Sequence, residues 1–182
     1  MLTGFVDSDR LARVRGYVLT GLVLFLLTVL QTTVLSNWKL FGAVPDLVLC
    51  ATVMLGFCRG REEGAVFGIV AGVLIAALGS YGVTVAPVFY MAVGYVCGHF
   101  GRTVYPKRLL SYLFFLGVSL PFAAVKTVIQ ACLMQENPRP AMLFLYAVLP
   151  QAAGTLICGA VLFLPLRLLL GKSGGKRKKG GY

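Results

Sequence analysis

The sequence has few of the groups that acid–base or nucleophilic chemistry requires. Its 182 residues include only six acidic residues and one histidine, and 13% of all residues are charged, about half the share of a typical soluble domain. Paired acids, a histidine cluster and a serine–histidine arrangement are all missing from the pattern, and an active site is built from such groups. We therefore expect a protein that is not an enzyme, with no catalytic residue and no cofactor.

The five cysteines are also poor candidates for chemistry. They stand singly in apolar segments, with no CxxC pair and no nearby histidine at metal-ligand spacing. We interpret them as small apolar packing residues, and we expect neither a disulfide framework nor a metal site.

What the sequence does have is long apolar runs. Hydrophobic residues make up 58% of the chain and the mean hydropathy is +0.86, which is typical of membrane proteins. We expect an all-α, polytopic membrane protein with six transmembrane helices in a compact bundle. The predicted spans are about 17–36, 44–58, 64–80, 83–100, 109–134 and 141–170, between an N-terminal segment, 1–16, and a disordered basic tail, 172–182.

The basic residues indicate how the chain is oriented. With both termini in the cytoplasm, fourteen lysines and arginines fall on cytoplasmic segments, while only Lys39 and Arg139 fall on outer loops. Short cytoplasmic loops are enriched in Lys and Arg in this way. The formal charge of +11 therefore indicates contact with anionic membrane lipid, and we expect no nucleic-acid partner.

Small residues recur at every fourth position of the third span. Gly64, Gly68, Gly72, Ala76 and Ser80 would lie near one helix face, which lets a neighbouring backbone approach closely in lipid. We expect a helix-packing face there, with a face that forms part of a functional groove as the alternative. Its expected partner is the Gly94–Gly98 ladder of the fourth span. We expect this third helix to be the buried spine of the bundle.

A few polar residues stand inside or beside the apolar segments. A lysine within a span costs about 2.5–3.5 kcal/mol to insert, so Lys126 draws attention. The outer halves of the first, fifth and last helices carry glutamines, and Pro45 with Asp46 suits a helix start. Two interpretations stay open, a partner or cavity site, or a snorkelling lysine with ordinary interhelical hydrogen bonds. The candidate residues are Gln31, Pro45, Asp46, Lys126, Gln130 and Gln151.

The order of short motifs resembles that of the rod shape-determining protein MreD family. The motifs lie between Leu30 and Gly98, and they are Leu30-Gln31, Val44-Pro45-Asp46-Leu47, Arg59-Gly60-Arg61, Gly68-x-x-x-Gly72, Gly82-Val83 and Gly94-Tyr95. Beyond them the likeness consists of span count, length and a basic C-terminus. One departure is Ala76, where such proteins commonly carry an acidic residue.

This resemblance implies a non-catalytic scaffold of the cell-elongation machinery in the bacterial inner membrane. Its implied partners are an MreC-like membrane-anchored protein and, directly or through it, a RodA-type glycosyltransferase, a class B penicillin-binding protein and the MreB filament. The six-helix arrangement of the family also resembles the S component of energy-coupling-factor transporters. The alternative function is therefore a substrate-binding S component of a vitamin transporter.

Overall fold

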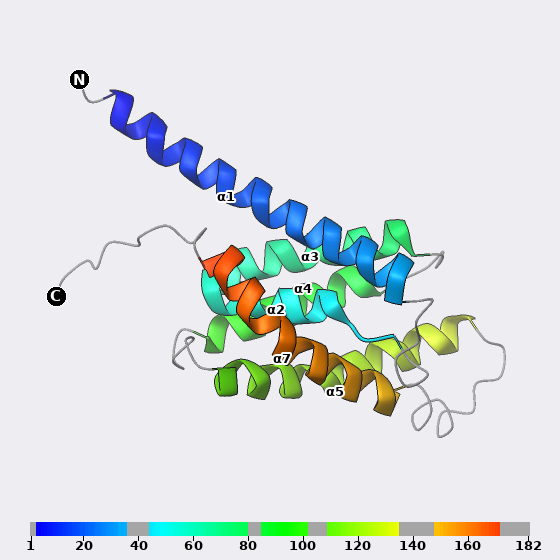
Figure 1. Ribbon diagram of the computed structural model, residues 1–182. Helices are drawn as coiled ribbons and strands as arrows, with labels where there is room; N and C mark the ends of the chain where they lie inside the picture. Colours follow the sequence, from blue (N-terminus) through cyan, green and yellow to red (C-terminus); the bar gives the residue numbers. More distant parts are fainter. Residues whose placement is uncertain (1–2, 36–43, 80–84, 102–108, 135–147, 172–182) are drawn as a thin grey trace.

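The computed structural model describes residues 3–35, 44–79, 85–101, 109–134 and 148–171, and all regular structure in these ranges is helical (Figure 1). The all-α expectation is therefore confirmed for the described residues. The helices are α1 (Thr3–Val29), a π-helical turn η1 (Leu30–Leu35), α2 (Leu47–Arg59), α3 (Arg61–Leu78), α4 (Ala86–Phe100), α5 (Leu109–Met134) and α7 (Leu149–Gly171). The first part of the predicted last span, 141–147, and the predicted tail, 172–182, lie outside the described residues.

Consecutive helices run in opposite directions along the bundle (Figure 1). The first turn of α2 contacts η1, which directly follows α1, because the Val48 N–H donates to the Gln31 side chain at 3.1 Å. The last residue of α2, Arg59, instead contacts Thr20 in the middle of α1, at 2.6 Å. Two helices that exchange contacts in this order are antiparallel.

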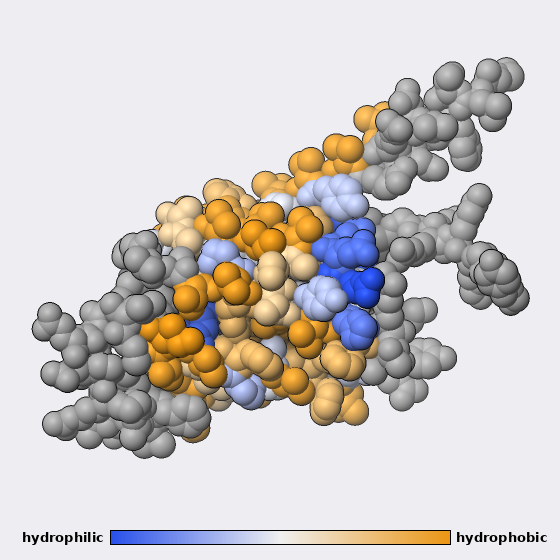
Figure 2. All heavy atoms as spheres, turned by 180° about the vertical axis from the view of Figure 1, so that it is seen from behind, coloured by the Kyte–Doolittle hydropathy of each residue, from blue (hydrophilic) through white to orange (hydrophobic). Residues whose placement is uncertain are grey.

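Three helices in the described part of the chain are long and apolar enough to cross a membrane, over Val14–Leu35, Leu109–Ile129 and Leu149–Leu168. The surface seen from behind is mostly hydrophobic, and hydrophilic residues gather at the end from which α1 projects (Figure 2). Such a surface is stable only in contact with lipid or protein. The chain is a membrane protein.

Helix α2 lies at the centre of the bundle. Every residue from Leu47 to Phe57 is buried, whereas α3 exposes Val66, Val70 and Val73. The expectation that α3 is the buried spine is therefore wrong. The small residues of α3 occupy only one narrow face, and the large apolar residues on its other face point outwards. Since α2 spans only about 20 Å, shelter inside the bundle explains how so short a helix is accommodated.

The glycine ladders of α3 and α4 lie against each other. A methyl group added at Gly64 would lie 2.6 Å from the carbonyl oxygen of Gly94, and one added at Gly98 would lie 2.5 Å from the Gly60 carbonyl carbon. Gly68 and Gly72 face the backbone of α4 in the same way, at Tyr90 and Pro87. Close backbone approach of this kind supplies packing in lipid. Ala76, the last predicted packing residue within α3, is only half-buried.

Helix α1 is longer than the first predicted span. It begins at Thr3 and continues without a break through the residues that we expected to form a separate N-terminal segment, 1–16. Its first half projects beyond the other helices (Figure 1). The apolar part starts at Val14, so the N-terminal turns extend the same helix past the apolar span.

Candidate functional site

The main polar cluster lies at the N-terminus of α2. Asp46 is the N-cap residue, and its Oδ1 accepts a hydrogen bond from the Leu49 N–H at 2.9 Å. The Val48 N–H donates to Oε1 of Gln31, which stands in the π-helical turn of η1. The first N–H groups of a helix have no partner within the helix, and a carboxylate also suits the positive end of its dipole. Asp46 and Gln31 supply acceptors for two of these N–H groups, those of Leu49 and Val48.

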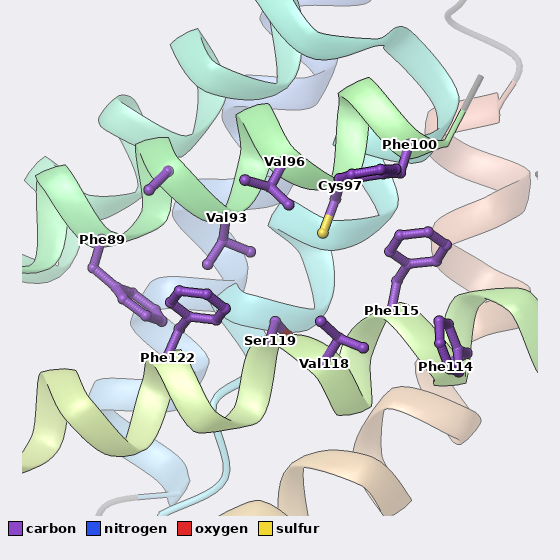
Figure 3. A pocket seen from close by; sticks show the side chains of 11 residues that line it. Phe89, Val93, Val96, Cys97, Phe100, Phe114, Phe115, Val118, Ser119 and Phe122 are labelled. Atoms are coloured by element: carbon purple, nitrogen blue, oxygen red, sulfur yellow. The ribbon is translucent and has the colours of Figure 1, made fainter. Parts of the chain in front are cut away.

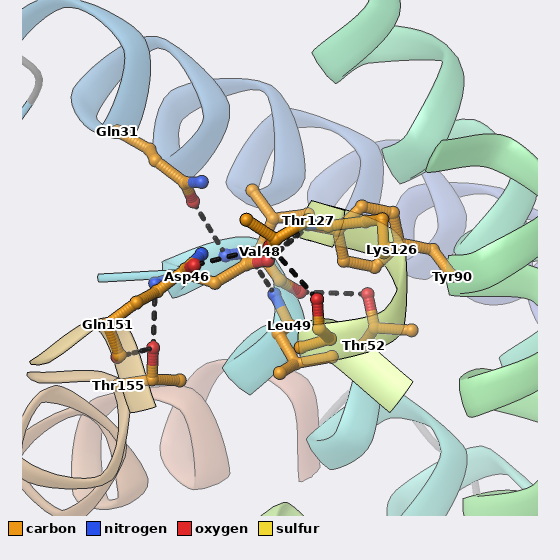
Figure 4. A network of polar contacts seen from close by, with 11 residues as sticks. Gln31, Asp46, Val48, Leu49, Thr52, Tyr90, Lys126, Thr127, Gln151 and Thr155 are labelled. Atoms are coloured by element: carbon orange, nitrogen blue, oxygen red, sulfur yellow. Dashed lines mark hydrogen bonds and ion pairs between the residues drawn. The ribbon is translucent and has the colours of Figure 1, made fainter. Parts of the chain in front are cut away.

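The second carboxylate oxygen of Asp46 binds two other helices. Lys126 Nζ of α5 lies 3.0 Å from Oδ2, and the Tyr90 hydroxyl of α4 donates to the same oxygen. Lys126 also donates to the Tyr90 oxygen at 3.0 Å. The Asp46 side chain is buried and that of Lys126 is nearly so, with 1% and 11% exposed. The three side chains thus form a compact ionic triad (Figure 4).

Aromatic rings surround the lysine ammonium. Lys126 Nζ lies 5.2 Å from the centre of the Phe89 ring and 4.7 Å from that of Tyr90. A cation over an aromatic face gains electrostatic energy, most of all when it is shielded from water. The ammonium is therefore stabilised by a carboxylate, a hydroxyl and two rings at once.

Helix α7 completes the cluster from the other side. The Asp46 N–H donates to Thr155 Oγ1 at 2.9 Å, and the Thr155 hydroxyl donates to the Gln151 carbonyl oxygen at 2.7 Å. The Thr127 hydroxyl of α5 lies 3.3 Å from Gln151 Oε1. A cavity of about 10 Å³ remains between Asp46, Gln151 and Thr155, which is about the space of one water molecule.

The structure brings together four of the six candidate residues, Gln31, Asp46, Lys126 and Gln151 (Figure 4). Pro45 is buried next to this cluster, and the side chain of Gln130 lies outside the described residues. Asp46 is the helix-start residue that the sequence predicts, and it is also the ion-pair partner of Lys126.

Sequence reasoning missed the contribution of α4, and it missed the threonines. Tyr90 is fully buried, and a buried tyrosine hydroxyl needs a hydrogen-bond partner, but nothing in its sequence neighbourhood shows that it is buried. Thr127 and Thr155 lie in apolar helices, where a threonine hydroxyl commonly bonds the carbonyl four residues earlier. Both do so, at 3.0 and 2.7 Å, and they contact the cluster in addition.

A second charged cluster, also missed, lies at the other end of α2. The Arg59 side chain is 3% exposed and forms an ion pair with Glu63 at 3.4 Å. Its guanidinium donates to the Gly16 carbonyl oxygen at 3.1 Å and to Thr20. A cation suits the negative end of the α2 dipole. Arg59 is therefore a structural residue of the bundle as well as one of the basic residues that indicate topology.

The described residues do not offer a metal site, because they contain no group of three His, Cys, Asp or Glu side chains placed to hold an ion. Both oxygens of Asp46 are occupied by donors from the protein itself. The main cluster joins η1, α2, α4, α5 and α7, and its acid and base neutralise each other.

Comparison of the chain with protein-family models, with curated proteins and with solved structures finds no match.

Proposed function

We propose that the chain is a non-catalytic membrane scaffold of the cell-elongation machinery, related to the MreD family, that helps to organise lateral peptidoglycan synthesis. The observation that carries this proposal is the internal pairing of Asp46, Lys126 and Tyr90, with a cavity of only about 10 Å³ beside them. Polar groups paired in this way stabilise a bundle. Among the described residues, the largest surfaces left for partners are apolar helix faces.

These faces fit partners that are themselves embedded in the membrane. Leu22 and Phe25 on α1 and Phe114 and Phe122 on α5 are exposed. Transmembrane helices associate through close packing of such faces. Together with the motif order between Leu30 and Gly98, this supports an MreC-like protein as the direct partner. A RodA-type glycosyltransferase and a class B penicillin-binding protein would bind directly or through it.

The proposed topology has six crossings and cytoplasmic termini in a bacterial inner membrane. The alternating directions of α1, α2, α3, α4, α5 and α7 support it (Figure 1). Helices α2 and α4 are shorter than a bilayer-spanning helix, and α2 crosses within the shelter of its neighbours. The excess of basic residues on one set of loops supports the orientation.

Co-purification tests the partner. A tagged copy of the chain, expressed in a rod-shaped host and extracted in mild detergent, is expected to retain an MreC-like protein. A tagged membrane protein of similar size and unrelated function serves as the control. Depletion of the chain is expected to make the cells round. Absence of the MreC-like protein from the complex, together with normal cell shape after depletion, would contradict the scaffold role.

The cavity beside Asp46 bears on the alternative, a vitamin-binding S component. Pockets for ligands of that size are about 300–1,000 Å³, far larger than the cavity of about 10 Å³. The Asp46 cluster therefore has no room for a vitamin, and on this ground we prefer the scaffold to the transporter subunit. Tight binding of a vitamin by the purified chain, or stable association with an ATPase module, would reverse this preference.

A further inference from the structure

The cavity beside Asp46 lies where the start of α2 meets α5 and α7. Part of its wall is formed by Ala123 and Ala124 of α5 and by Ala152 of α7. An alanine side chain is a single methyl group, so these three residues leave space between the helices. The volume of about 10 Å³ is about the space of one water molecule.

A polar wall distinguishes this cavity from the larger hollow of about 280 Å³ between α4 and α5 (Figure 3). That hollow is lined mainly by phenylalanine and valine side chains, and the one hydroxyl among the described residues of its wall, that of Ser119, already donates to a carbonyl oxygen of α5. A buried water molecule needs two to four polar partners. The cavity beside Asp46 offers them, because Asp46, Gln151 and Thr155 line it.

Asp46 and Thr155 can each accept one more hydrogen bond. A carboxylate has about four lone-pair sites, and that of Asp46 accepts one bond each from the Leu49 N–H, Tyr90 and Lys126. A hydroxyl oxygen has two lone pairs, and that of Thr155 accepts from the Asp46 N–H. A water molecule has two hydrogens, so it can donate to the carboxylate and to the hydroxyl at once.

Gln151 supplies the donor that a water oxygen requires. Its Oε1 lies 3.3 Å from the Thr127 hydroxyl, and none of the described residues accepts a hydrogen bond from its amide nitrogen. The amide nitrogen carries two donor hydrogens, and a donor without an acceptor inside a protein costs free energy. A water molecule in the cavity would accept one of these hydrogens.

We propose that one buried water molecule occupies the cavity and hydrogen-bonds Asp46, Gln151 and Thr155, whose side chains lie together in Figure 4. The water donates to the carboxylate and to the Thr155 hydroxyl, and it accepts from the Gln151 amide. It thereby links two side chains of α7 to the acid that Lys126 of α5 neutralises. The site depends on the geometry of the Asp46 cluster, and it requires neither the scaffold role nor the proposed orientation.

A crystallographic map of the full chain in a lipid phase, at a resolution that shows ordered water, tests the site directly. We expect one density peak at about 2.7–3.2 Å from the Asp46 carboxylate and from the Gln151 amide. A map without density at this place would overturn the proposal. A peak at about 2.0–2.6 Å from several oxygen atoms would indicate a metal cation and would overturn it as well.

A pair of variants tests the site in solution. Ala152→Ser and Ala152→Cys each add one atom to the wall of the cavity, and either atom displaces the water. Only the serine hydroxyl replaces its hydrogen bonds well, because a thiol is a weak donor and acceptor. We therefore expect Ala152→Ser to melt about 2–4 °C above Ala152→Cys in the same detergent.

The matched controls are Ala153→Ser and Ala153→Cys, because Ala153 is the next residue of α7, is exposed and does not line the cavity. A serine at either position can bond the carbonyl four residues earlier, so the controls correct for that bond. At Ala153 we expect the cysteine variant to be at least as stable as the serine variant. If cysteine is also at least as stable as serine at Ala152, an apolar group suits the cavity and the water site is refuted.

Discussion

Asp46 and Lys126 are 80 positions apart in the sequence, and their charged groups lie 3.0 Å apart in the interior of the bundle. Their ion pair joins the start of α2 to the middle of α5, and Tyr90 of α4 bonds both partners. In an apolar interior each charge depends on the other, because a buried charge without a partner is costly. The stability of the bundle is therefore sensitive to this one contact.

Replacement of Lys126 by methionine keeps much of the side-chain volume and removes the charge. Asp46 then remains buried without its cation, and we expect the free energy of unfolding to fall by about 3–5 kcal/mol. Denaturant unfolding of the purified protein in mixed micelles measures the loss. Arg61→Met is the control, because Arg61 is exposed, and we expect a change within about 0.5 kcal/mol.

The double variant Asp46→Asn/Lys126→Met tests whether the loss comes from the unpaired charge. Asparagine also caps helices well, so the start of α2 keeps an acceptor while the carboxylate charge disappears. The double variant is expected to be more stable than Lys126→Met alone. The single variant Asp46→Asn completes the comparison. If the loss in the double variant equals the sum of the losses in Asp46→Asn and Lys126→Met, the charges are not coupled and the ion pair does not explain the cluster.

The Tyr90 hydroxyl is the link of α4 to this pair. Tyr90→Phe removes one donor to Asp46 and one acceptor for Lys126, and we expect a loss of about 1–2 kcal/mol. Tyr95→Phe, on the same helix but 46% exposed, is expected to leave stability unchanged. Thermal unfolding of both variants in one detergent makes the comparison. Equal melting temperatures would contradict the role given to the buried hydroxyl.

The close packing of the α3 and α4 glycine ladders predicts opposite effects of a glycine-to-alanine substitution at two sites. Gly64→Ala would place a methyl group 2.6 Å from the Gly94 oxygen, and forcing α3 and α4 apart is expected to cost about 1–3 kcal/mol. Gly117→Ala meets open space, and alanine favours a helix by up to about 1 kcal/mol over glycine. Melting temperatures should therefore fall for Gly64→Ala and stay level or rise for Gly117→Ala. A lower melting temperature for Gly117→Ala than for Gly64→Ala would contradict the close packing of α3 against α4.

Cysteine labelling tests the orientation. In a chain freed of its own cysteines, Glu62→Cys should react with a membrane-impermeant maleimide only after the cells are opened, because Glu62 is 85% exposed on the proposed cytoplasmic side. Lys39→Cys, on a predicted outer loop, should react in intact cells. Reaction of Glu62→Cys in intact cells would invert the proposed topology.

Sequence reasoning found the charged residues of the cluster because placing a charged side chain in an apolar segment costs free energy. A lysine and a carboxylate beside apolar segments stand out, and each then needs a partner. The distance between them could not be known, because nothing local to Asp46 or Lys126 specifies how α2 and α5 cross. Tyr90 gave no signal, since tyrosine is tolerated on both lipid-facing and buried surfaces and only the packing of α4 decides between them.

The glycine ladder of α3 was read correctly as small residues at helical spacing and wrongly as a sign of the bundle's centre. Small residues indicate how closely two backbones approach, but they do not indicate how many sides of a helix are covered. The better indicator of a central helix is the shortness of α2, with Asp46 and Arg59 at its ends. A helix of this kind needs neighbours on every side.

The enclosure of α2 also constrains the order of assembly during synthesis. At its Arg59 end, the partners Gly16 and Thr20 are made before the helix and Glu63 is made four residues after Arg59, so this end can be neutralised early. At its Asp46 end, Lys126 is synthesised 80 residues later. Until α5 leaves the ribosome and the insertion machinery, the carboxylate lacks its cation. We therefore expect helix α2 to reach its final place only late in biogenesis, when the second half of the chain has entered the bilayer.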